Sequence, residues 1–348
     1  MKILYLGDNN PNSTSLHRAN ALCRIGHNVI HLNPYNEFEI QLQNPILGRI
    51  HYYTGYKYLQ FSFLNWLKKV FYNTERFDII WINSGELFGS NTLKYLKQFT
   101  NHLVLYNNDD PTGGRDGGRF KSLLKAIPFY DLCVVMRNQN KDEFYAIGAK
   151  KVMRLYMSYD EIAHRPFDKY LDIPMNYKSE VAFIGTWIRG ENRDEFILKL
   201  INSGIIVSIW GERWQKSKNW NKIKPYYKGK SLGGREYVAA IQGAKICIGM
   251  LSKGNRDLHT TRSLEIPFAN GVLCAERTSE HLNFYKEGEE AVFWNDSNEC
   301  IKICKTLLNN HILREQIRIA GNIRVKMNKV GNEDICKKII EEFISINN

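Results

Sequence analysis

The stretch from Ser252 to Cys274 constrains the fold of this chain more than any other part of the sequence. An apolar run, residues 244–251, precedes it and is typical of a buried parallel strand, and a second apolar run, residues 271–275, ends it. A Gly-Asn pair after the first run suits a tight turn, and a short helix is predicted around Glu265. This succession of strand, polar turn, helix and strand predicts a doubly wound α/β domain.

The polar part of this stretch has the composition of an anion site. Free backbone N–H groups and the dipole at the start of a helix attract phosphate, and Arg256 and Arg262 add guanidinium groups that suit phosphate oxygens. Glu265 would repel a phosphate, so its carboxylate is expected to accept hydrogen bonds from sugar hydroxyls. The stretch therefore predicts a nucleotide-sugar site, and the alternative is an ordinary strand–loop–helix of an α/β domain.

The residues of this region resemble a known family. RSLEIPFANG, followed by EHLNFYKEGEEAVFW, is similar to the C-terminal half of glycosyltransferases of the GT-B fold, and more narrowly to the CgeB-like (spore maturation protein-like) group. Asn270 and Leu264 depart from that group, which has Cys and Phe there. The resemblance covers nearly all of residues 103–327. Near the C-terminus the family often has a His-Thr pair with a downstream Arg, and residues 324–331 of this chain lack it.

The resemblance implies a GT-B fold, in which two doubly wound parallel-sheet domains face each other across a cleft. The expected boundaries are 1–168 for an N-terminal, acceptor-side Rossmann-like domain and 178–328 for a C-terminal, donor-binding domain. A last amphipathic helix, within 329–348, is expected to pack back on the N-terminal domain.

The predicted donor-binding residues lie in three loops of the second domain. A Gly-Thr turn and two later arginines, at the end of a strand, resemble the family's diphosphate loop, and an aromatic residue ends the next strand. Together with the central stretch, they give the donor-side set of Gly185, Thr186, Arg189, Arg193, Trp210, His259, Thr260, Thr261, Arg262 and Glu265. A solvated Arg193 and a Trp210 buried in the core are the alternatives for those two residues.

Three carboxylates are the catalytic candidates. Asp109 and Asp110 follow a predicted strand, where open α/β sheets place their sites, and either could be the general base for an acceptor hydroxyl. An Asp-Pro turn with solvated acids is the alternative. Asp257 lies eight residues before Glu265, which resembles the paired acidic residues of retaining GT-B enzymes, with Asp where Glu is usual, and favours retention. An inverting route with Asp109 or Asp110 as base is the alternative. Asp8 and Asn9, after the first strand, are acceptor-side candidates or plain turn residues.

Composition limits the remaining possibilities. The net charge of +12 suits anionic substrates and peripheral contact with an anionic membrane. No apolar run approaches the ~20 residues of a membrane span, and the first ten residues predict a strand rather than a signal peptide. Seven scattered cysteines predict a reducing cytoplasm without disulfides or a zinc site. No metal or other cofactor is expected, because the nucleotide sugar is itself a substrate.

The function predicted from the sequence is transfer of a sugar, hexose or pentose, from a nucleotide sugar to an acceptor hydroxyl, in surface glycan or other polysaccharide synthesis. The acceptor is expected to be a glycan, a lipid-linked sugar or a protein. One alternative is a GT-B epimerase that acts on the nucleotide sugar without an acceptor. Another is a basic nucleic-acid-binding protein, which the even spread of charge does not favour.

Overall fold

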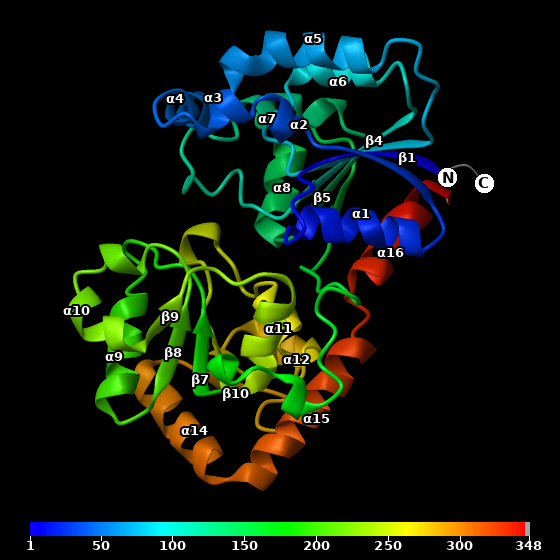
Figure 1. Ribbon diagram of the computed structural model, residues 1–348. Helices are drawn as coiled ribbons and strands as arrows, with labels where there is room; N and C mark the ends of the chain where they lie inside the picture. Colours follow the sequence, from blue (N-terminus) through cyan, green and yellow to red (C-terminus); the bar gives the residue numbers. More distant parts are fainter. Residues whose placement is uncertain (345–348) are drawn as a thin grey trace. The chain divides into compact units, whose positions relative to one another are not determined.

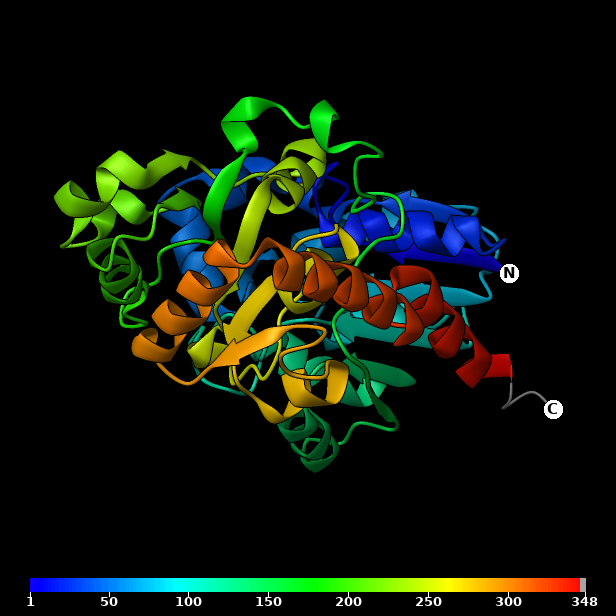
Figure 2. The ribbon, with the colours of Figure 1, turned by 90° about the horizontal axis from the view of Figure 1, so that it is seen from below.

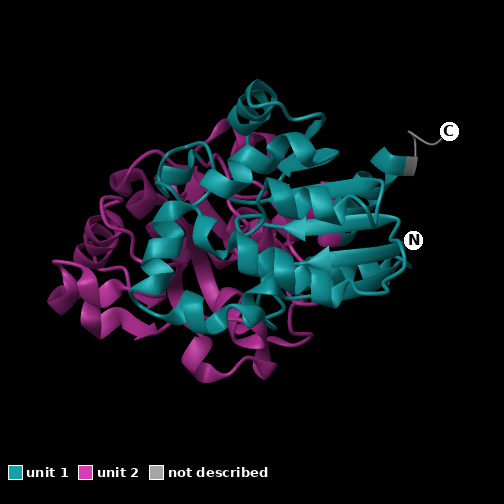
Figure 3. Ribbon diagram, turned by 90° about the horizontal axis from the view of Figure 1, so that it is seen from above, with its two compact units in different colours: residues 1–156, 254–256, 333–348 teal, residues 157–253, 257–332 magenta. Residues whose placement is uncertain are grey.

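The computed structural model describes residues 1–344 and divides the chain into two compact units. The first unit comprises residues 1–156, 254–256 and the chain from Glu333 onward, and the second comprises residues 157–253 and 257–332 (Figure 3). The first unit thus ends at Tyr156 rather than at residue 168, and the segment 254–256, in the middle of the predicted donor stretch, belongs to it.

A six-stranded parallel sheet forms the centre of the first unit, with strand order β2-β1-β3-β4-β5-β6. Its strands are near-continuous apolar runs, as expected for a parallel sheet that is covered on both faces. They are β1 (Lys2–Leu6), β2 (Asn28–Leu32), β3 (Ile79–Asn83), β4 (His102–Asn107), β5 (Leu132–Val135) and β6 (Val152–Arg154).

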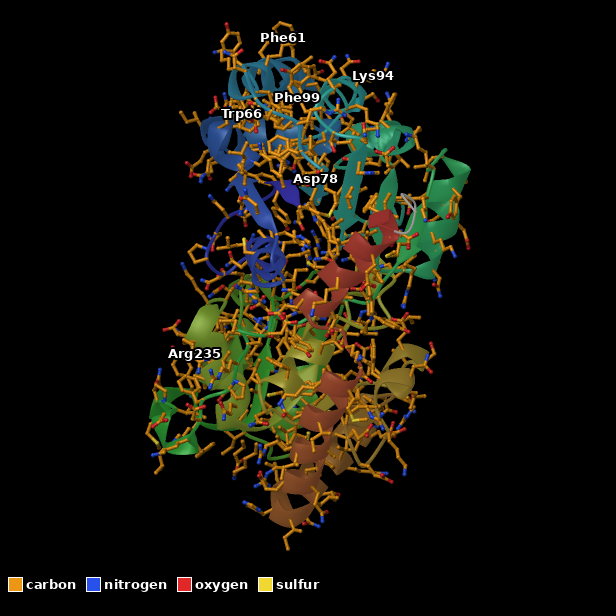
Figure 4. The ribbon with its side chains drawn as sticks, turned by 90° about the vertical axis from the view of Figure 1, so that its right-hand side faces the viewer. Phe61, Trp66, Asp78, Lys94, Phe99 and Arg235 are labelled. Atoms are coloured by element: carbon orange, nitrogen blue, oxygen red, sulfur yellow. The ribbon has the colours of Figure 1, made fainter. Side chains whose placement is uncertain are left out.

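Helices cover both faces of this sheet (Figure 1). One face holds the aromatic-rich core, in which Trp66 and Phe99, labelled in Figure 4, take part in a series of ring contacts. Its helices are α2 (Pro34–Glu37), α3 (Glu39–Gln43), α4 (Leu47–Thr54), α5 (Gln60–Val70), α6 (Ser90–Leu96), α7 (Lys121–Ala126) and α8 (Asn138–Ala146), with 3-10 turns at Lys57–Leu59 and Ile127–Phe129.

The other face is covered by α1 (Thr14–Arg24) and α16 (Asn332–Ile344), the first and last helices of the described chain. From Glu333 onward, α16 belongs to the first unit. Arg24 on α1 donates to Glu333 at 2.5 Å, and the ring of Phe343 lies 4.9 Å from that of His102, at the start of β4. These contacts attach the end of the chain to the first sheet.

The second unit repeats the architecture, with strand order β12-β11-β10-β7-β8-β9. Its parallel strands are β7 (Ser179–Ile184), β8 (Val207–Trp210), β9 (Tyr227–Gly229), β10 (Ala244–Gly249), β11 (Leu273–Glu276) and β12 (Val292–Trp294). Two parallel six-stranded sheets with flanking helices confirm the predicted GT-B fold.

Helices flank this sheet too, and α14 continues into α15 along the second unit (Figure 2). The apolar side chains of α9 and α14 fill the core on one face of the sheet. The helices are α9 (Arg193–Asn202), α10 (Trp220–Ile223), α11 (Gly234–Gly243), α12 (Arg262–Phe268), α13 (Ser279–Phe284), α14 (Ser297–Asn309) and α15 (His311–Met327), with 3-10 turns at Tyr170–Asp172, Met175–Tyr177, Trp214–Lys216, Lys224–Tyr226 and Lys253–Asn255. In the described residues, no helix is both long and apolar enough to cross a membrane.

Candidate functional site

The candidate donor site lies at the carboxyl ends of the strands of the second unit, where open α/β sheets bind ligands. The strand β7 ends at Ile184 and is followed by the Gly-Thr turn, while β10 ends at Gly249 and is followed by the polar stretch. The two strands are hydrogen-bonded neighbours, so both loops emerge at the same edge of the sheet.

Arg193, the first residue of α9, joins these two loops. Its guanidinium donates to the carbonyl oxygens of Thr186 and Leu251, at 2.9 Å each, and lies 2.6 Å from a carboxylate oxygen of Glu191. The residue is only 7% exposed, which excludes the solvated role considered for it. Its buried Nε has no hydrogen-bond partner among the described residues.

Arg262, the first residue of α12, is the second cation of the site. Its Nε is also buried and has no partner in the described part of the chain. Burial lowers the pKa of Arg193, and the positive charge of Arg262 lowers it further. Two guanidinium groups that repel each other and retain unused N–H donors form a place where a doubly charged anion would satisfy both.

The start of α12 contributes less than the sequence predicts. The helix is only seven residues long, with Pro267 inside it, so its dipole is small. The backbone N–H of Thr260 donates to Ser263 Oγ at 3.0 Å, and both Thr260 and Thr261 are partly exposed. The arginine side chains, rather than the helix start, therefore carry the positive charge of the site.

Glu265 points into the interior of the second unit and is 5% exposed. Its Oε2 accepts a hydrogen bond of 2.6 Å from the hydroxyl of Tyr237, on α11. His164 Nε2 lies 3.7 Å from Oε1, beyond hydrogen-bond distance. No ion pair joins Glu265 to Arg262 in the described chain, so Glu265 does not serve to neutralise the arginine.

Two predicted donor-binding residues have structural roles instead. His259 is 2% exposed: the Met157 N–H donates to its Nε2 at 2.9 Å, and its Nδ1 lies 2.5 Å from a carboxylate oxygen of Glu280. Because Nε2 accepts, Nδ1 carries the proton of the neutral ring, and neither nitrogen is left for a ligand. Trp210 is buried beside Tyr177, so its ring offers no face to a nucleobase.

The remaining predicted residues of the second unit, Gly185, Arg189 and Asp257, differ in their exposure to solvent. Gly185 donates its N–H to the carbonyl of Trp210, at 2.8 Å, and a Cβ at Gly185 would lie 2.8 Å from the ring of Phe183, so glycine is needed there for close packing. Arg189 is exposed, and Asp257 is buried. The structure thus brings together Thr186, Arg193, Arg262 and Glu265 around the loops of β7 and β10.

Asp110, a predicted catalytic base, is fixed by an ion pair in the first unit. Arg256 Nε and Nη2 donate to its two oxygens at 2.6 and 2.7 Å, and Asn140 donates at 2.7 Å. Burial opposes ionisation, but these hydrogen bonds outweigh it and hold the pKa of Asp110 below its ordinary value. With a side chain that is 0% exposed, Asp110 cannot reach an acceptor hydroxyl, and its assignment as a base is wrong.

Arg256 is therefore not a phosphate ligand, contrary to the prediction. Its Nη1 and Nη2 also donate to the two oxygens of Glu143, at 2.8 and 2.9 Å, so all three guanidinium nitrogens donate to carboxylates of the first unit. The neighbouring residue, Asn255, accepts a hydrogen bond from Arg115, which lies in a loop with four glycines, residues 112–119. The segment 254–256 thus belongs to the first unit through side-chain contacts that no local pattern shows.

A polar cavity of about 420 Å³ opens at the carboxyl ends of β1 and β3 in the first unit. Burial raises the pKa of Glu86, whose carboxylate accepts hydrogen bonds from Arg119 Nε (2.5 Å) and Tyr35 (3.1 Å). Ser84 has a left-handed backbone (φ 69°), a strained conformation for a residue other than glycine. The cavity is lined by Asp8, Ser13, Thr14, Ser15, Tyr35, Asn83, Ser84, Glu86 and Arg119.

The other predictions for the first unit fall near this cavity. Asp8 lines it, and Asn9 accepts a hydrogen bond from Asn33 and is exposed. Asp109 has a side chain that is 32% exposed and lies 3.5 Å from Arg119, so this carboxylate, unlike Asp110, is accessible. No local pattern in the sequence pairs Tyr237, Glu86 or Arg119 with a partner, because the partners are 28 or more positions away.

Comparison with known proteins adds a family match for the second unit. The family described as "Glycosyl transferase-like" matches residues 192–340, a range that includes Arg193, Arg262 and Glu265. No curated protein matches the chain in sequence. The match begins after the Gly-Thr turn that follows β7 and extends into α16.

Solved structures of GT-B enzymes match along the whole chain at low sequence identity. HepE from Anabaena, in complex with UDP and glucose, is 10% identical with a TM-score of 0.69 over 99% of this chain and 100% of its own. Sucrose-phosphate synthase from Thermosynechococcus elongatus is 12% identical (TM-score 0.70, 99% of each chain). Trehalose 6-phosphate synthase from Burkholderia multivorans is 11% identical (TM-score 0.62, 99% and 96%). These likenesses establish the fold.

Proposed function

We propose that the chain is a glycosyltransferase that moves a hexosyl or pentosyl group from a nucleotide sugar to an acceptor hydroxyl. The observation that carries the proposal is the pair of arginines, the buried Arg193 and the partly exposed Arg262, whose buried Nε atoms have no partner in the described chain, together with the buried carboxylate of Glu265. Cations suit a diphosphate, and a carboxylate suits ribose hydroxyls. The glycosyl transferase-like match over residues 192–340 supports the same activity.

In this proposal the arginines stabilise the leaving diphosphate. Negative charge on the diphosphate grows as the bond to the sugar breaks, so fixed guanidinium groups stabilise the transition state more than the ground state. Positioning and electrostatics then suffice, and we propose that transfer needs no metal ion. Two routes follow: Asp109 is the candidate general base of an inverting transfer, and the spacing of Asp257 and Glu265 favours a retaining one. Uridine diphosphate sugars are the first donors to test, because HepE binds UDP-glucose.

The biological setting completes the proposal. We infer membership of the CgeB-like group and a role in surface glycan or polysaccharide synthesis in the cytoplasm. The acceptor would be a glycan, a lipid-linked sugar or a protein, and the charge of +12 supports peripheral contact with an anionic membrane. Asp8 and the polar cavity of the first unit are the acceptor-side candidates.

A thermal-shift panel of nucleotides and nucleotide sugars tests the donor assignment. A ligand at ~100 times its dissociation constant stabilises the folded state by about 2.7 kcal/mol, which raises the melting temperature measurably. We expect nucleoside diphosphates and one class of nucleotide sugar to do so, and sugar transfer to acceptors to follow for that donor. A chain that binds heparin but no nucleotide diphosphate would be a nucleic-acid-binding protein instead. NMR of the products would reveal an epimerase if the sugar changes configuration without an acceptor.

A further inference from the structure

Three cysteine sulfur atoms converge in the core of the second unit. Cys274 lies in β11, and Cys300 and Cys304 lie one turn apart on α14. Their Sγ atoms are all within 4.8 Å of one another, and all three residues are 0% exposed. Among the described residues, no other group of three or more cysteine, histidine or acidic side chains brings its ligand atoms so close.

The secondary structure explains why the thiols meet. Residues i and i+4 lie on the same face of a helix, so Cys300 and Cys304 both point from α14 toward the sheet. Cys274 pairs with Ile248 of β10 on one side and with Val292 of β12 on the other, and all of these belong to one apolar core. The three sulfurs therefore lie in an apolar core, and no fourth described ligand joins them.

The spacing of the sulfurs fits a three-coordinate metal ion. A metal–sulfur bond of about 2.3 Å gives sulfur–sulfur separations of about 4 Å in a planar trigonal site. In the structure the sulfur–sulfur separations are at most 4.8 Å. Each sulfur would need to move by less than about 1 Å to reach the separations of the trigonal site. Cysteines that only fill space in an apolar core do not need to bring their sulfur atoms together. The convergence of these three sulfurs therefore favours a metal site over packing alone.

The ligand set selects the kind of cation. Structural zinc sites take four ligands, and only three are present here. Soft thiolate ligands favour Cu(I), which has no need of oxygen or nitrogen donors. We propose that Cys274, Cys300 and Cys304 form a trigonal binding site for one Cu(I) ion. Each cysteine that binds as a thiolate releases its proton to solvent when the ion enters.

The copper site would link β11 and α14, two elements that lie near Arg193. Glu276, two residues after Cys274, accepts a hydrogen bond of 2.9 Å from the N–H of Leu251, whose carbonyl accepts from Arg193. Ser297, at the start of α14, lines a cavity of about 270 Å³ together with Arg193 and Glu276. A bound ion would join β11 to α14 beside this cavity, and we expect it to stabilise the second unit. The proposal does not depend on the proposed enzymatic activity.

Anaerobic titration of the full chain with Cu(I) tests the site. The background is Cys23→Ser, which removes the exposed thiol, and a colorimetric Cu(I) chelator competes for the metal. We expect one Cu(I) per chain, a sulfur-to-copper charge-transfer band in the ultraviolet, and three sulfur neighbours by X-ray absorption spectroscopy. Cys304→Ala should weaken binding at least 100-fold, whereas Cys247→Ala, which removes a buried thiol outside the cluster, should leave it unchanged.

The outcomes are distinct. Equal affinity of the Cys304→Ala and Cys247→Ala chains would overturn the proposal, as would a spectrum with two sulfur neighbours or the absence of a one-equivalent endpoint. Preferential binding of Zn(II), with a fourth ligand that is not sulfur, would overturn the choice of cation. If Cys304→Ala does not fold, as judged by circular dichroism, Cys300→Ala and Cys274→Ala provide the same comparison, and the X-ray absorption spectrum of the background chain decides without any cluster variant.

Discussion

At the scale of single residues, a tyrosine decides how Glu265 can be used. The hydroxyl of Tyr237 holds Oε2 in place, and burial together with the charge of Glu265 raises the pKa of that hydroxyl well above its ordinary value. Tyr237 therefore stays a neutral donor at physiological pH. It leaves Oε1, which has no hydrogen bond within the described chain, as the oxygen that a ligand hydroxyl can reach.

Replacing Glu265 tests whether this carboxylate binds ribose. Glu265→Gln keeps the shape but replaces one acceptor oxygen with a donor, so we expect the affinity for ribonucleoside diphosphates to fall by roughly 1.5–3 kcal/mol, the range for a hydrogen bond to a charged group. The loss for 2′-deoxy analogues should be smaller, because they lack one of the hydroxyls. Calorimetry with both ligand series measures the difference.

A structural role for Glu265 makes the opposite prediction. The variant would then weaken ribo and deoxy ligands equally and would lower the melting temperature of the chain without ligand. Tyr237→Phe is the matched control, because it removes the hydrogen bond to Oε2 and leaves the carboxylate. We expect it to weaken both series by no more than about 1 kcal/mol.

Arg262 should be the main phosphate contact of the second unit. Its buried Nε has no partner in the described chain, so Arg262→Ala removes a donor that the folded protein does not otherwise use. We expect nucleoside diphosphate affinity to fall by roughly 1.5–3 kcal/mol in calorimetry, with little change in thermal stability. Arg318→Ala, which removes a partly exposed arginine from α15, is the control and should bind as the unmodified chain does. Unchanged affinity of Arg262→Ala would exclude the phosphate role.

At the scale of elements, a buried histidine ties α13 to its neighbours. His281 Nδ1 donates to the Glu276 carbonyl, at the end of β11, at 2.6 Å, and Nε2 accepts from Ser263 Oγ, on α12, at 2.7 Å. Its ring stacks on Phe293 of β12. Burial lowers the pKa of His281 to about 4, so the neutral ring holds three elements together.

This histidine predicts a loss of stability in weak acid. The pKa of an unfolded histidine is about 6.5, so below that pH the unfolded chain binds a proton that the folded chain binds only near pH 4. The free energy of unfolding should therefore be fully retained above pH 6.5 and fall by about 3 kcal/mol between pH 6.5 and 4. Denaturant unfolding across this range measures the slope.

Two variants separate His281 from other acid effects. The asparagine of His281→Asn cannot titrate. The free energy of unfolding of this variant should be lower than that of the unmodified chain at pH 6.5, and should change much less between pH 6.5 and 4. His311→Asn removes an exposed histidine at the start of α15 and should keep the full slope. A His281→Asn chain whose stability falls as steeply as that of the unmodified chain would assign the acid sensitivity to other groups.

At the scale of the whole molecule, the sequence predicted the alternation of strands and helices and the GT-B fold, because buried parallel strands read as apolar runs and helix ends carry glycine. It also predicted the helix that follows the Gly-Thr turn, now α9, and the short helix around Glu265, now α12. It did not assign the helices α2 to α6, α10 or α13.

The errors concern contacts between residues distant in sequence. His259 and Trp210 have partners 102 and 33 positions away, and each partner buries the side chain. The sulfur cluster was missed for the same reason, since its cysteines meet only when α14 packs on β11. The positions of predicted strand ends indicate which side chains lie at the same edge of a sheet. The partner of a charged side chain depends on the tertiary fold and cannot be read from neighbouring positions.

Arg256 and Arg262, six positions apart, should therefore behave differently when removed. Arg256 pairs with Asp110, whose side chain is fully buried, so Arg256→Ala leaves a carboxylate without its charged partner in the first unit. Removing one partner of such a pair is costly, and we expect the free energy of unfolding to fall by roughly 2–3 kcal/mol. Nucleoside diphosphate affinity should stay within twofold.

The double variant Arg256→Ala/Asp110→Asn should regain part of the stability, because an uncharged amide costs less to bury. If the Arg256→Ala chain keeps its stability but binds nucleoside diphosphates tenfold more weakly, Arg256 is a phosphate ligand of the donor site.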